Sequence, residues 1–435
     1  MGPSRQATDP HHGLLAWWAV FVSGALVQAW FWVRSVWIYL DQVDLYRLGM
    51  ALARDGELVP FGKLSTGGLP IPGVVLELLV GLPLMAWMDV RAATLVVIAF
   101  HLAAVWILSR LLAEDFGWGF AALFLAIFWL SPWRLFHSAF LWETNYLLLP
   151  AALHLAACRA QRSAARFGAS VLLAATILLT FQMHGSALIL MIASALLVYR
   201  KRLFLHWGGV AVGTVLGSIS LLPTVSAVLG GSGLPVRPAT AANLLVRLNS
   251  VEKGLLYWFR LGSVDVGRRF RQSVFCIEPG GGDTVPFPVL CNLLEITQIL
   301  ALASVLVTVV ATWWFFRRRR NRDTEDPAQI TRAWYGDYTL AMLVAVLVSS
   351  FLSPVLIQGW HVLIALPVAC LPVTAWIADH WPRAGSLMRA ILLLFVLWRV
   401  PASLLLLGHP MYAHPKSPDL PRHVAPSDLR VLLPD

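Results

Sequence analysis

Charged residues are scarce in this chain of 435 residues. They make up 13% of the sequence, whereas a soluble domain carries roughly 25%. Hydrophobic residues make up 58%, and the mean hydropathy is +0.71. This balance excludes a soluble globular domain. A run of about 20 apolar residues is what a helix needs to cross a bilayer, and inside lipid such a run must be helical because its backbone meets no water. The expected fold class is an all-α polytopic membrane protein.

Other absences exclude further classes. No spacing of cysteine and histidine suggests a zinc site, and no basic stripe interleaved with aromatic residues accompanies the net charge of +10, which argues against nucleic-acid binding. No small-residue cleavage site follows the first apolar run, 14–33, which is therefore expected to be a retained span. No internal repeat of the kind that transporters carry is present.

The arginines are gathered in clusters between apolar runs. These clusters are RAQRSAAR (159–166), YRKR (199–202), RRRRNR (317–322) and PRAGSLMR (382–389). Apolar segments lie at 14–33, 69–88, 92–112, 118–131, 142–158, 168–182, 185–199, 206–229, 293–316, 336–352, 360–378 and 385–407. If the segments from 118 onward alternate, all four clusters fall on one side, which the positive-inside rule makes cytoplasmic. The outer side then holds 131–141, 182–185, 230–292, 353–360 and the tail after 407.

The number of early segments conflicts with a cytoplasmic N-terminus, because 159–166 would then lie outside. Segment 69–88 is the one expected not to cross, since Pro70, Pro72 and Pro83 interrupt it and Glu77 lies near its middle. We expect it to be re-entrant or to lie along the outer leaflet. A bundle of about 11–12 spanning helices with juxtamembrane helices on the outer side follows.

Two of the four cysteines, Cys158 and Cys370, lie in expected spans and are interpreted as small buried apolar residues. Cys276 and Cys291 lie in the large outer loop. They form either two free thiols or a disulfide that closes about 15 residues and contributes about 3 kcal/mol.

Acidic residues near the outer surface of the membrane are informative because the positive-inside rule, which concerns Lys and Arg, does not explain their positions. On a helix over 41–55, Asp41 shares a stripe with Leu45, Leu48 and Leu52. A carboxylate there would be partly desolvated and a stronger proton acceptor. The residues alone favour the simpler interpretation, that Asp41 or Asp44 is the N-cap of this helix.

Glu143 begins another span on the same side. It is either one of a pair of carboxylates that position and deprotonate a hydroxyl, or a first-turn residue that satisfies the helix dipole. Groups expected at the same level that can hold a phosphate or diphosphate are Arg134, His137, Gln182, His184, Arg247, Lys253, Arg260 and His361. His184 has an alternative as an interfacial anchor, and the tryptophans are by default an aromatic belt.

The order of these motifs resembles a family. Asp41, Tyr46, Gly56 and TGGLPIPG (66–73) are followed by LSPWRLFHSAFLWETNYLLL, which carries Glu143. LLTFQMHGSALILM carries His184, and QGWHVLIALPVAC carries His361 and Pro367. The pattern is similar to that of the lipid-phosphate-sugar-dependent glycosyltransferases of the GT-C fold, within the bacterial protein-mannosyltransferase-like and aminoarabinose-transferase-like branch. It covers about residues 15–200 well and the rest loosely. The chain departs from the pattern at Gln42, His184 and Val362, where relatives have Glu, Lys and Tyr, so the base stays open between Asp41 and Asp44.

The resemblance implies an integral-membrane glycosyltransferase of the bacterial inner membrane with its active site facing the periplasm. It would transfer a sugar, with inversion, from a polyprenyl-phosphate donor to a hydroxyl on a protein, lipid or glycan. Asp41 would be the base, Glu143 would position a substrate, and His184 with Arg134, His361 or Arg260 would stabilise the departing phosphate. No cofactor is firmly implied, and a divalent cation is left open. The expected parts are a GT-C module over 1–229 with its outer loop at 34–91, an outer loop over 230–292, spans over 293–407 and an outer tail over 408–435. The alternatives are a transporter or lipid-linked sugar flippase, and a polymer ligase that uses a diphosphate-linked glycan.

Overall fold

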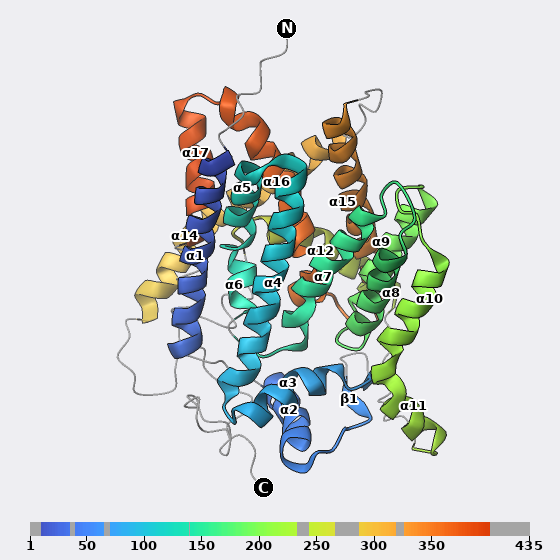
Figure 1. The fold of residues 1–435 in the computed structure, drawn as a ribbon. Coiled ribbons are helices and arrows are strands. Elements are labelled where there is room, and N and C mark those ends of the chain that lie inside the picture. Colours follow the sequence, from blue (N-terminus) through green and yellow to red (C-terminus); the bar gives the residue numbers. More distant parts are fainter. Residues whose placement is uncertain are drawn as a thin grey trace.

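The computed structural model describes residues 10–34, 40–64, 70–138, 140–232, 243–265, 287–318 and 326–400. Within these ranges the chain is an all-α polytopic membrane protein, with almost no strands (Figure 1). Six stretches of helix are long and apolar enough to cross a membrane. These are His11–Trp30 of α1 (Pro10–Arg34), α4 (Val90–Phe116), Trp207–Leu229, Leu300–Arg318 of α14 (Phe287–Arg318), α15 (Pro327–Leu352) and Gly359–Arg383.

Shorter apolar helices complete the bundle. They are α3 (Val75–Ala86), α5 (Trp118–Phe128), α8 (Phe167–Phe181), α9 (Ala187–Tyr199) and α17 (Ser386–Leu397). The remaining helical elements are α2 (Leu40–Met50), the π-helical turn η1 (Ala51–Asp55), α6 (Pro132–Phe136), η2 (Glu143–Leu147), α7 (Leu148–Ala160), α10 (Trp207–Ser218), η3 (Ile219–Leu221), α11 (Leu222–Leu229), α12 (Leu244–Gly262), η4 (Gly359–Ala365), α16 (Leu366–His380) and η5 (Trp381–Arg383). The total of 11–12 spans stays a prediction.

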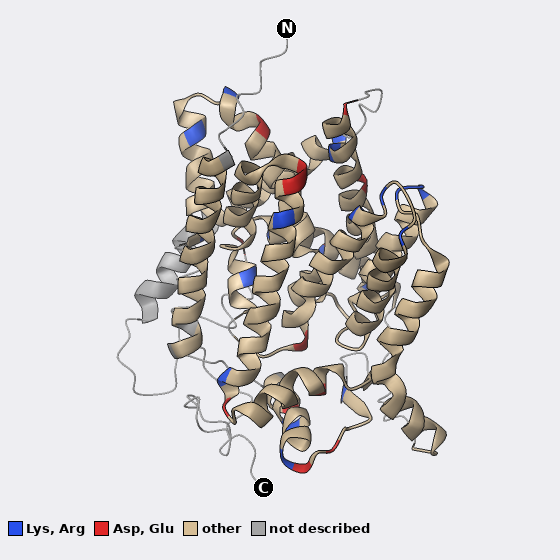
Figure 2. Ribbon diagram, viewed as in Figure 1, with Lys and Arg blue, Asp and Glu red and all other residues tan. Residues whose placement is uncertain are grey.

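The two ends of the bundle differ in charge (Figure 2). One end, here called the arginine-rich face, holds the ends of α7, α9, α14 and α16, where the described residues of the four arginine clusters lie (Figure 1). The opposite end, here called the α2–α3 face, holds α2, α3 and a hairpin of β1 (Phe61–Leu64) and β2 (Pro70–Pro72). The clusters therefore share one end, as the sequence predicts. The side of the membrane that this end faces stays a prediction.

Helix α3 does not cross the bundle. Its 12 residues measure about 18 Å at about 1.5 Å per residue, against about 30 Å of hydrocarbon. It lies with α2 across the lower ends of the other helices in Figure 1. Leu76, Val80 and Leu84, spaced four apart, are buried in a small core shared with α2 and the start of α4. Both carboxylate oxygens of Glu77 accept the Val59 N–H at 3.0 Å, which explains an acid within this segment.

Helices α8 and α10 pack closely because α10 presents glycines on one face. A Cβ on Gly209 would lie 2.5 Å from the carbonyl oxygen of Phe167, and one on Gly213 would lie 2.3 Å from that of Val171. Small residues four apart allow such close approach of helices in membranes. The packing fixes the lower end of α10 beside the loop that follows α8.

The backbone is irregular between α5 and α7, where α6 and η2 are short. Such backbone is tolerated at membrane depth when protein surrounds it. Here Arg134 is fully buried, and its Nε donates to the Trp129 carbonyl at 2.7 Å, at the end of α5. Arg399 is also fully buried and donates to the carbonyls of Gly262 and Ser263 at the end of α12. Each buried guanidinium thus satisfies carbonyls that a helix end leaves open.

Candidate functional site

A lysine and a glutamate meet at the α2–α3 face. Lys63 lies on β1, and Glu143 is the first residue of η2, which leads directly into α7. The Nζ of Lys63 lies 3.5 Å from Oε1 of Glu143, and the two side chains are 11% and 12% exposed. The helix start favours the negative charge, and the ammonium group adds to that preference. Glu143 is therefore a first-turn residue and also a member of a charged pair.

Two histidines lie at the same face, held by one serine. His184 follows α8, and His361 lies in η4; their rings stack with centroids 5.8 Å apart. The Ser186 hydroxyl donates to the carbonyl of His361 at 2.6 Å, and the backbone N–H of Ser186 donates to Nδ1 of His184 at 3.1 Å. This serine ties the loop after α8 to η4.

The hydrogen bonds of His361 fix which of its ring nitrogens carries the proton. Nδ1 of His361 accepts the Gln358 N–H at 2.9 Å, so the proton of its neutral ring is on Nε2. Nδ1 of His184 is 3.1 Å from the backbone nitrogen of Ser186 and 2.6 Å from its hydroxyl oxygen, whose proton goes to the His361 carbonyl. Among the described residues neither Nε2 has a hydrogen-bond partner, so both Nε2 atoms are open to a ligand.

Burial, with His361 and Lys63 nearby, lowers the pKa of His184 to about 3. Desolvation disfavours the charged imidazolium, and the ammonium group of Lys63 adds repulsion. At neutral pH His184 is thus a neutral imidazole beside a cation. The proximity of Lys63 also joins the histidines to the Lys63–Glu143 pair in one site.

Aromatic rings connect η2 to η4. Trp142, the residue before Glu143, lies with its ring centroid 5.2 Å from that of Trp360, the residue before His361. On its other side Trp142 stacks on His137 at 6.0 Å, and His137 stacks on Trp133 at 6.2 Å. The ring contacts hold Glu143 and His361 at a fixed separation.

The carboxylates expected on α2 have different surroundings. Asp44 is exposed and pairs with Arg47 at 3.5 Å, with side chains 51% and 62% exposed. Asp41 lies in the first turn of α2, and its side chain is outside the described part of the structure. Of the leucines expected on its stripe, Leu45 and Leu52 are buried and Leu48 is half-buried. Helix α2 packs against β1, which carries Lys63.

Tyr46 and Gln182 hold the site's scaffold. Tyr46 is fully buried, and its hydroxyl donates to the carbonyl of Val90 at 2.9 Å, which ties α2 to the start of α4. Burial, with Tyr146 and Asp89 nearby, raises the pKa of Tyr46, so its hydroxyl stays a donor. Gln182 donates to the carbonyl of Gly217 at 2.7 Å and accepts from the Ser220 hydroxyl at 2.7 Å. Both side chains are occupied by these contacts.

Arg134 and His137 lie in a separate buried network. Nη1 of Arg134 donates to Gln28 at 2.7 Å, and its guanidinium lies 3.6 Å from the centre of the Trp129 ring. Nδ1 of His137 is 2.8 Å from the side-chain oxygen of Asn145. Both side chains are fully buried, and the structure does not bring Arg134 to the histidine pair.

Arg260 lies on α12 and pairs with Asp265. Its Nε is 2.9 Å from Oδ2 of Asp265, whose side chain is 1% exposed, and the Asp265 carbonyl accepts from Trp133. Arg247 lies in the first turn of α12, and Lys253 lies near its middle. Arg260 is thus paired with the residue whose backbone carbonyl binds Trp133, and it belongs to the scaffold around that tryptophan.

The sequence interpretation missed Lys63, Gln358 and Asp265. For Lys63 there is a usable signal, since a lysine between turn residues on an expected outer face opposes the positive-inside rule. Gln358 caps η4 and Asp265 pairs with Arg260 beyond the end of α12, while each also contacts an aromatic residue more than 100 positions away, which sequence spacing does not reveal.

The remaining predictions concern the cysteines and a metal site, and only some of these residues lie in the described part of the structure. Cys158 and Cys370 are buried free thiols, as expected. Cys276 and the side chain of Cys291 lie outside the described residues. Within the described ranges no group of three His, Cys, Asp or Glu side chains is arranged to hold a metal ion.

Comparison with family models, curated proteins and solved structures found no match.

Proposed function

We propose that the chain is an integral-membrane glycosyltransferase that transfers a sugar from a polyprenyl-phosphate donor to a hydroxyl acceptor at the α2–α3 face. One observation carries the proposal: the Lys63–Glu143 pair, the Nε2–H of His361 and the unpartnered Nε2 of His184 meet at that face. The combination of a cation and a neutral imidazole N–H donor suits a phosphate, and a nearby carboxylate suits a hydroxyl. The periplasm is the compartment proposed for this face.

In the proposed reaction the acceptor hydroxyl oxygen attacks the anomeric carbon as the bond to the phosphate oxygen breaks. Asp41 takes the hydroxyl proton, and the prenyl phosphate leaves with its negative charge. Lys63 and the imidazole N–H of His361 stabilise that charge where it develops. Glu143 accepts a hydrogen bond from a hydroxyl of the sugar or acceptor. The configuration at the anomeric carbon is inverted.

The test is transfer from radiolabelled polyprenyl-phosphate sugars in proteoliposomes. The variants are Asp41→Asn and, as a matched control on the same helix, Asp44→Asn. Loss of a general base lowers the rate by about 10²–10⁴-fold, so Asp41→Asn should lose nearly all transfer. Asp44→Asn should keep the wild-type rate within about twofold, because an exposed helix pair contributes only about 0.2–0.5 kcal/mol.

Equal turnover by wild type and Asp41→Asn would remove Asp41 from the mechanism. No transfer by the wild type with any polyprenyl-phosphate sugar, combined with movement of the lipid-linked sugar across the proteoliposome membrane, would replace the proposal with a flippase.

A further inference from the structure

A pocket opens at the arginine-rich face, at the end of the molecule opposite the proposed site. Its volume is about 410 Å³, within the range of about 300–1,000 Å³ that small-molecule sites occupy. The upper ends of α4, α5, α14, α15 and α16 enclose it. Two candidate spans end here and one begins here: α14 at Arg318, the span containing α16 at Arg383, and α15 at Pro327. The pocket therefore lies where spans meet the membrane–water interface.

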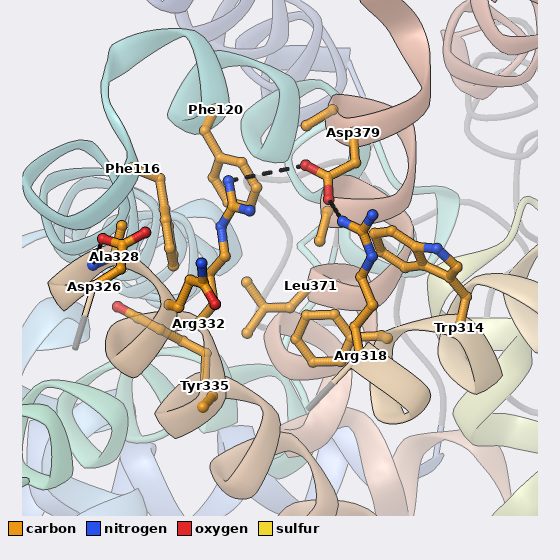
Figure 3. A pocket seen from close by; sticks show the side chains of 15 residues that line it. Phe116, Phe120, Trp314, Arg318, Asp326, Ala328, Arg332, Tyr335, Leu371 and Asp379 are labelled. Carbon is orange, nitrogen blue, oxygen red and sulfur yellow. Dashed lines mark hydrogen bonds and ion pairs between the residues drawn. The ribbon is translucent and has the colours of Figure 1, made fainter. Parts of the chain in front are cut away.

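The pocket has a charged side. Arg318 and Arg332 approach Asp379 from opposite directions (Figure 3). Arg318 contacts one carboxylate oxygen, and Nη2 of Arg332 lies 3.9 Å from the other. The arginine side chains are 54% and 53% exposed, so both guanidinium groups remain accessible to a ligand. Two guanidinium groups directed at one point are the arrangement that holds a phosphate.

The other walls are apolar. Phe116, Phe120, Trp314, Phe315 and Leu371 line them (Figure 3). The Arg318 guanidinium lies 4.8 Å from the centre of the Trp314 ring, so the charged and apolar sides join directly. Beside the pocket, on the surface of the helix bundle, Trp313 and Ile330 are 59% and 57% exposed. These side chains continue the apolar surface toward the lipid. A ligand that fills this space needs a charged head and an apolar body.

The charges of the lining decide what head fits. Among the described residues that line the pocket, the charged ones are Arg318, Arg332, Asp326 and Asp379, two of each sign. Asp326 caps α15 through one oxygen, which accepts from the Ala328 N–H at 3.0 Å. A purely anionic head group would compete with Asp379 for both arginines and would leave that carboxylate without a cation. A head with both a phosphate and an ammonium group finds a partner for each.

We propose that this pocket binds a zwitterionic phospholipid of the ethanolamine type, with its phosphodiester on Arg318 and Arg332 and its ammonium on the carboxylates. The apolar part of the lipid lies against the aromatic wall. This site is independent of the glycosyltransferase proposal.

The test is native mass spectrometry of the full chain, delipidated in detergent and then given phosphatidylethanolamine, phosphatidylglycerol or inorganic phosphate. We expect one phosphatidylethanolamine per protein, about tenfold weaker binding of phosphatidylglycerol, and no binding or displacement by inorganic phosphate. Arg318→Gln combined with Arg332→Gln should weaken phosphatidylethanolamine binding at least about tenfold. Arg110→Gln is the matched control, because Arg110 is also 53% exposed and paired with a carboxylate but lies outside the pocket.

Ala375→Trp fills the pocket while it leaves both arginines in place. It should also weaken phosphatidylethanolamine binding about tenfold at an unchanged melting temperature. Equal lipid retention by the wild type and all variants would show a non-specific lipid shell and overturn the proposal. Displacement by inorganic phosphate would show a free-anion site. Equal binding of phosphatidylglycerol would remove the role of the carboxylates and contradict the proposed class of lipid.

Discussion

The ammonium nitrogen of Lys63 lies 3.5 Å from a carboxylate oxygen of Glu143, and both side chains are nearly buried. The lysine comes from a short hairpin, and the glutamate from the start of a buried helix. Removal of one partner leaves the other charge in a place that water reaches poorly. The pair therefore contributes to stability as well as to the proposed site.

A double-mutant cycle measures this coupling. Lys63→Met and Glu143→Gln should each lower the stability by about 1–3 kcal/mol, less than the cost for a fully buried pair. The double variant should be less unstable than the sum of the two, with a coupling of about 0.5–3 kcal/mol. The measurement is thermal unfolding in detergent of the wild type and the three variants. Strictly additive effects would show that the two charges do not interact.

The pH dependence of stability should contain a contribution from His184. Its pKa is lowered to about 3, below the value of about 6.5 for an unfolded chain. A lowered histidine pKa gives stability that is present above pH ~6.5 and lost as the pH falls toward 3, because the unfolded chain then binds the proton first.

Relative to His184→Gln, the wild type should lose roughly 1 kcal/mol between pH 7 and pH 5, with allowance for the partial exposure of the ring. Melting temperatures of both proteins across this range provide the measurement, and the other titrating groups cancel in the comparison. A difference between the two proteins that is independent of pH would mean that His184 is protonated normally in the folded state.

Gly73 should tolerate no side chain. Its φ is +84°, and a Cβ would lie 2.1 Å from the side-chain oxygen of Gln182. Gly73→Ala therefore combines backbone strain of about 1–2 kcal/mol with displacement of Gln182. The matched control is Gly56→Ala, where φ is +67° and no atom lies within 4 Å of the Cβ.

We expect Gly73→Ala to lower the melting temperature clearly more than Gly56→Ala, and we expect Gln182→Ala to recover part of that excess. Equal losses at the two glycines would show that only the backbone conformation matters.

Arg134 should prove structural. Arg134→Lys keeps the charge but loses the flat contact with the Trp129 ring and one of the bonds to Trp129 and Gln28, at a cost of about 1–3 kcal/mol. Thermal unfolding should show this loss, while transfer per folded molecule stays within a few-fold of the wild type. Arg389→Lys, at an exposed site, is the control. A raised KM for the lipid donor at an unchanged melting temperature would instead assign Arg134 to phosphate binding.

Features that depend on local composition were predictable from the sequence. Apolar runs predicted the helical membrane fold, and the arginine clusters predicted that α7, α9, α14 and α16 end at one face. The prolines of 69–88 predicted a segment that does not cross, and α3 is that segment. The positions of Glu143, His184 and His361 followed from alternation of spans, which brought all three to one level.

Features that depend on register and side-chain contacts were not predictable. Lys63 reaches Glu143 from a hairpin whose β1–β2 pairing is irregular between Phe61 and Leu64, so strand alternation in the sequence does not show which way this side chain points. The partner of Arg260 is five residues further on, beyond the end of its helix, where helical spacing gives no guidance. Arg134 is a residue type that binds phosphate, but the carbonyl at a helix end and Gln28 hold its Nε and Nη1 in the buried network, and Nη2 has no hydrogen-bond partner among the described residues.

The hydroxyl of Thr224, on α11, joins both ends of the hairpin that carries Lys63. It accepts from the backbone N–H of Gly73 at 2.9 Å and donates to the carbonyl of Pro60. Helices α10, η3 and α11 form one stretch long enough to span the membrane. The depth of this span in the bilayer therefore sets the depth of the hairpin. The lysine is thus positioned by a lipid-facing helix that contributes no charge of its own, and a tilt of that helix in a thinner bilayer would move the ammonium group relative to Glu143.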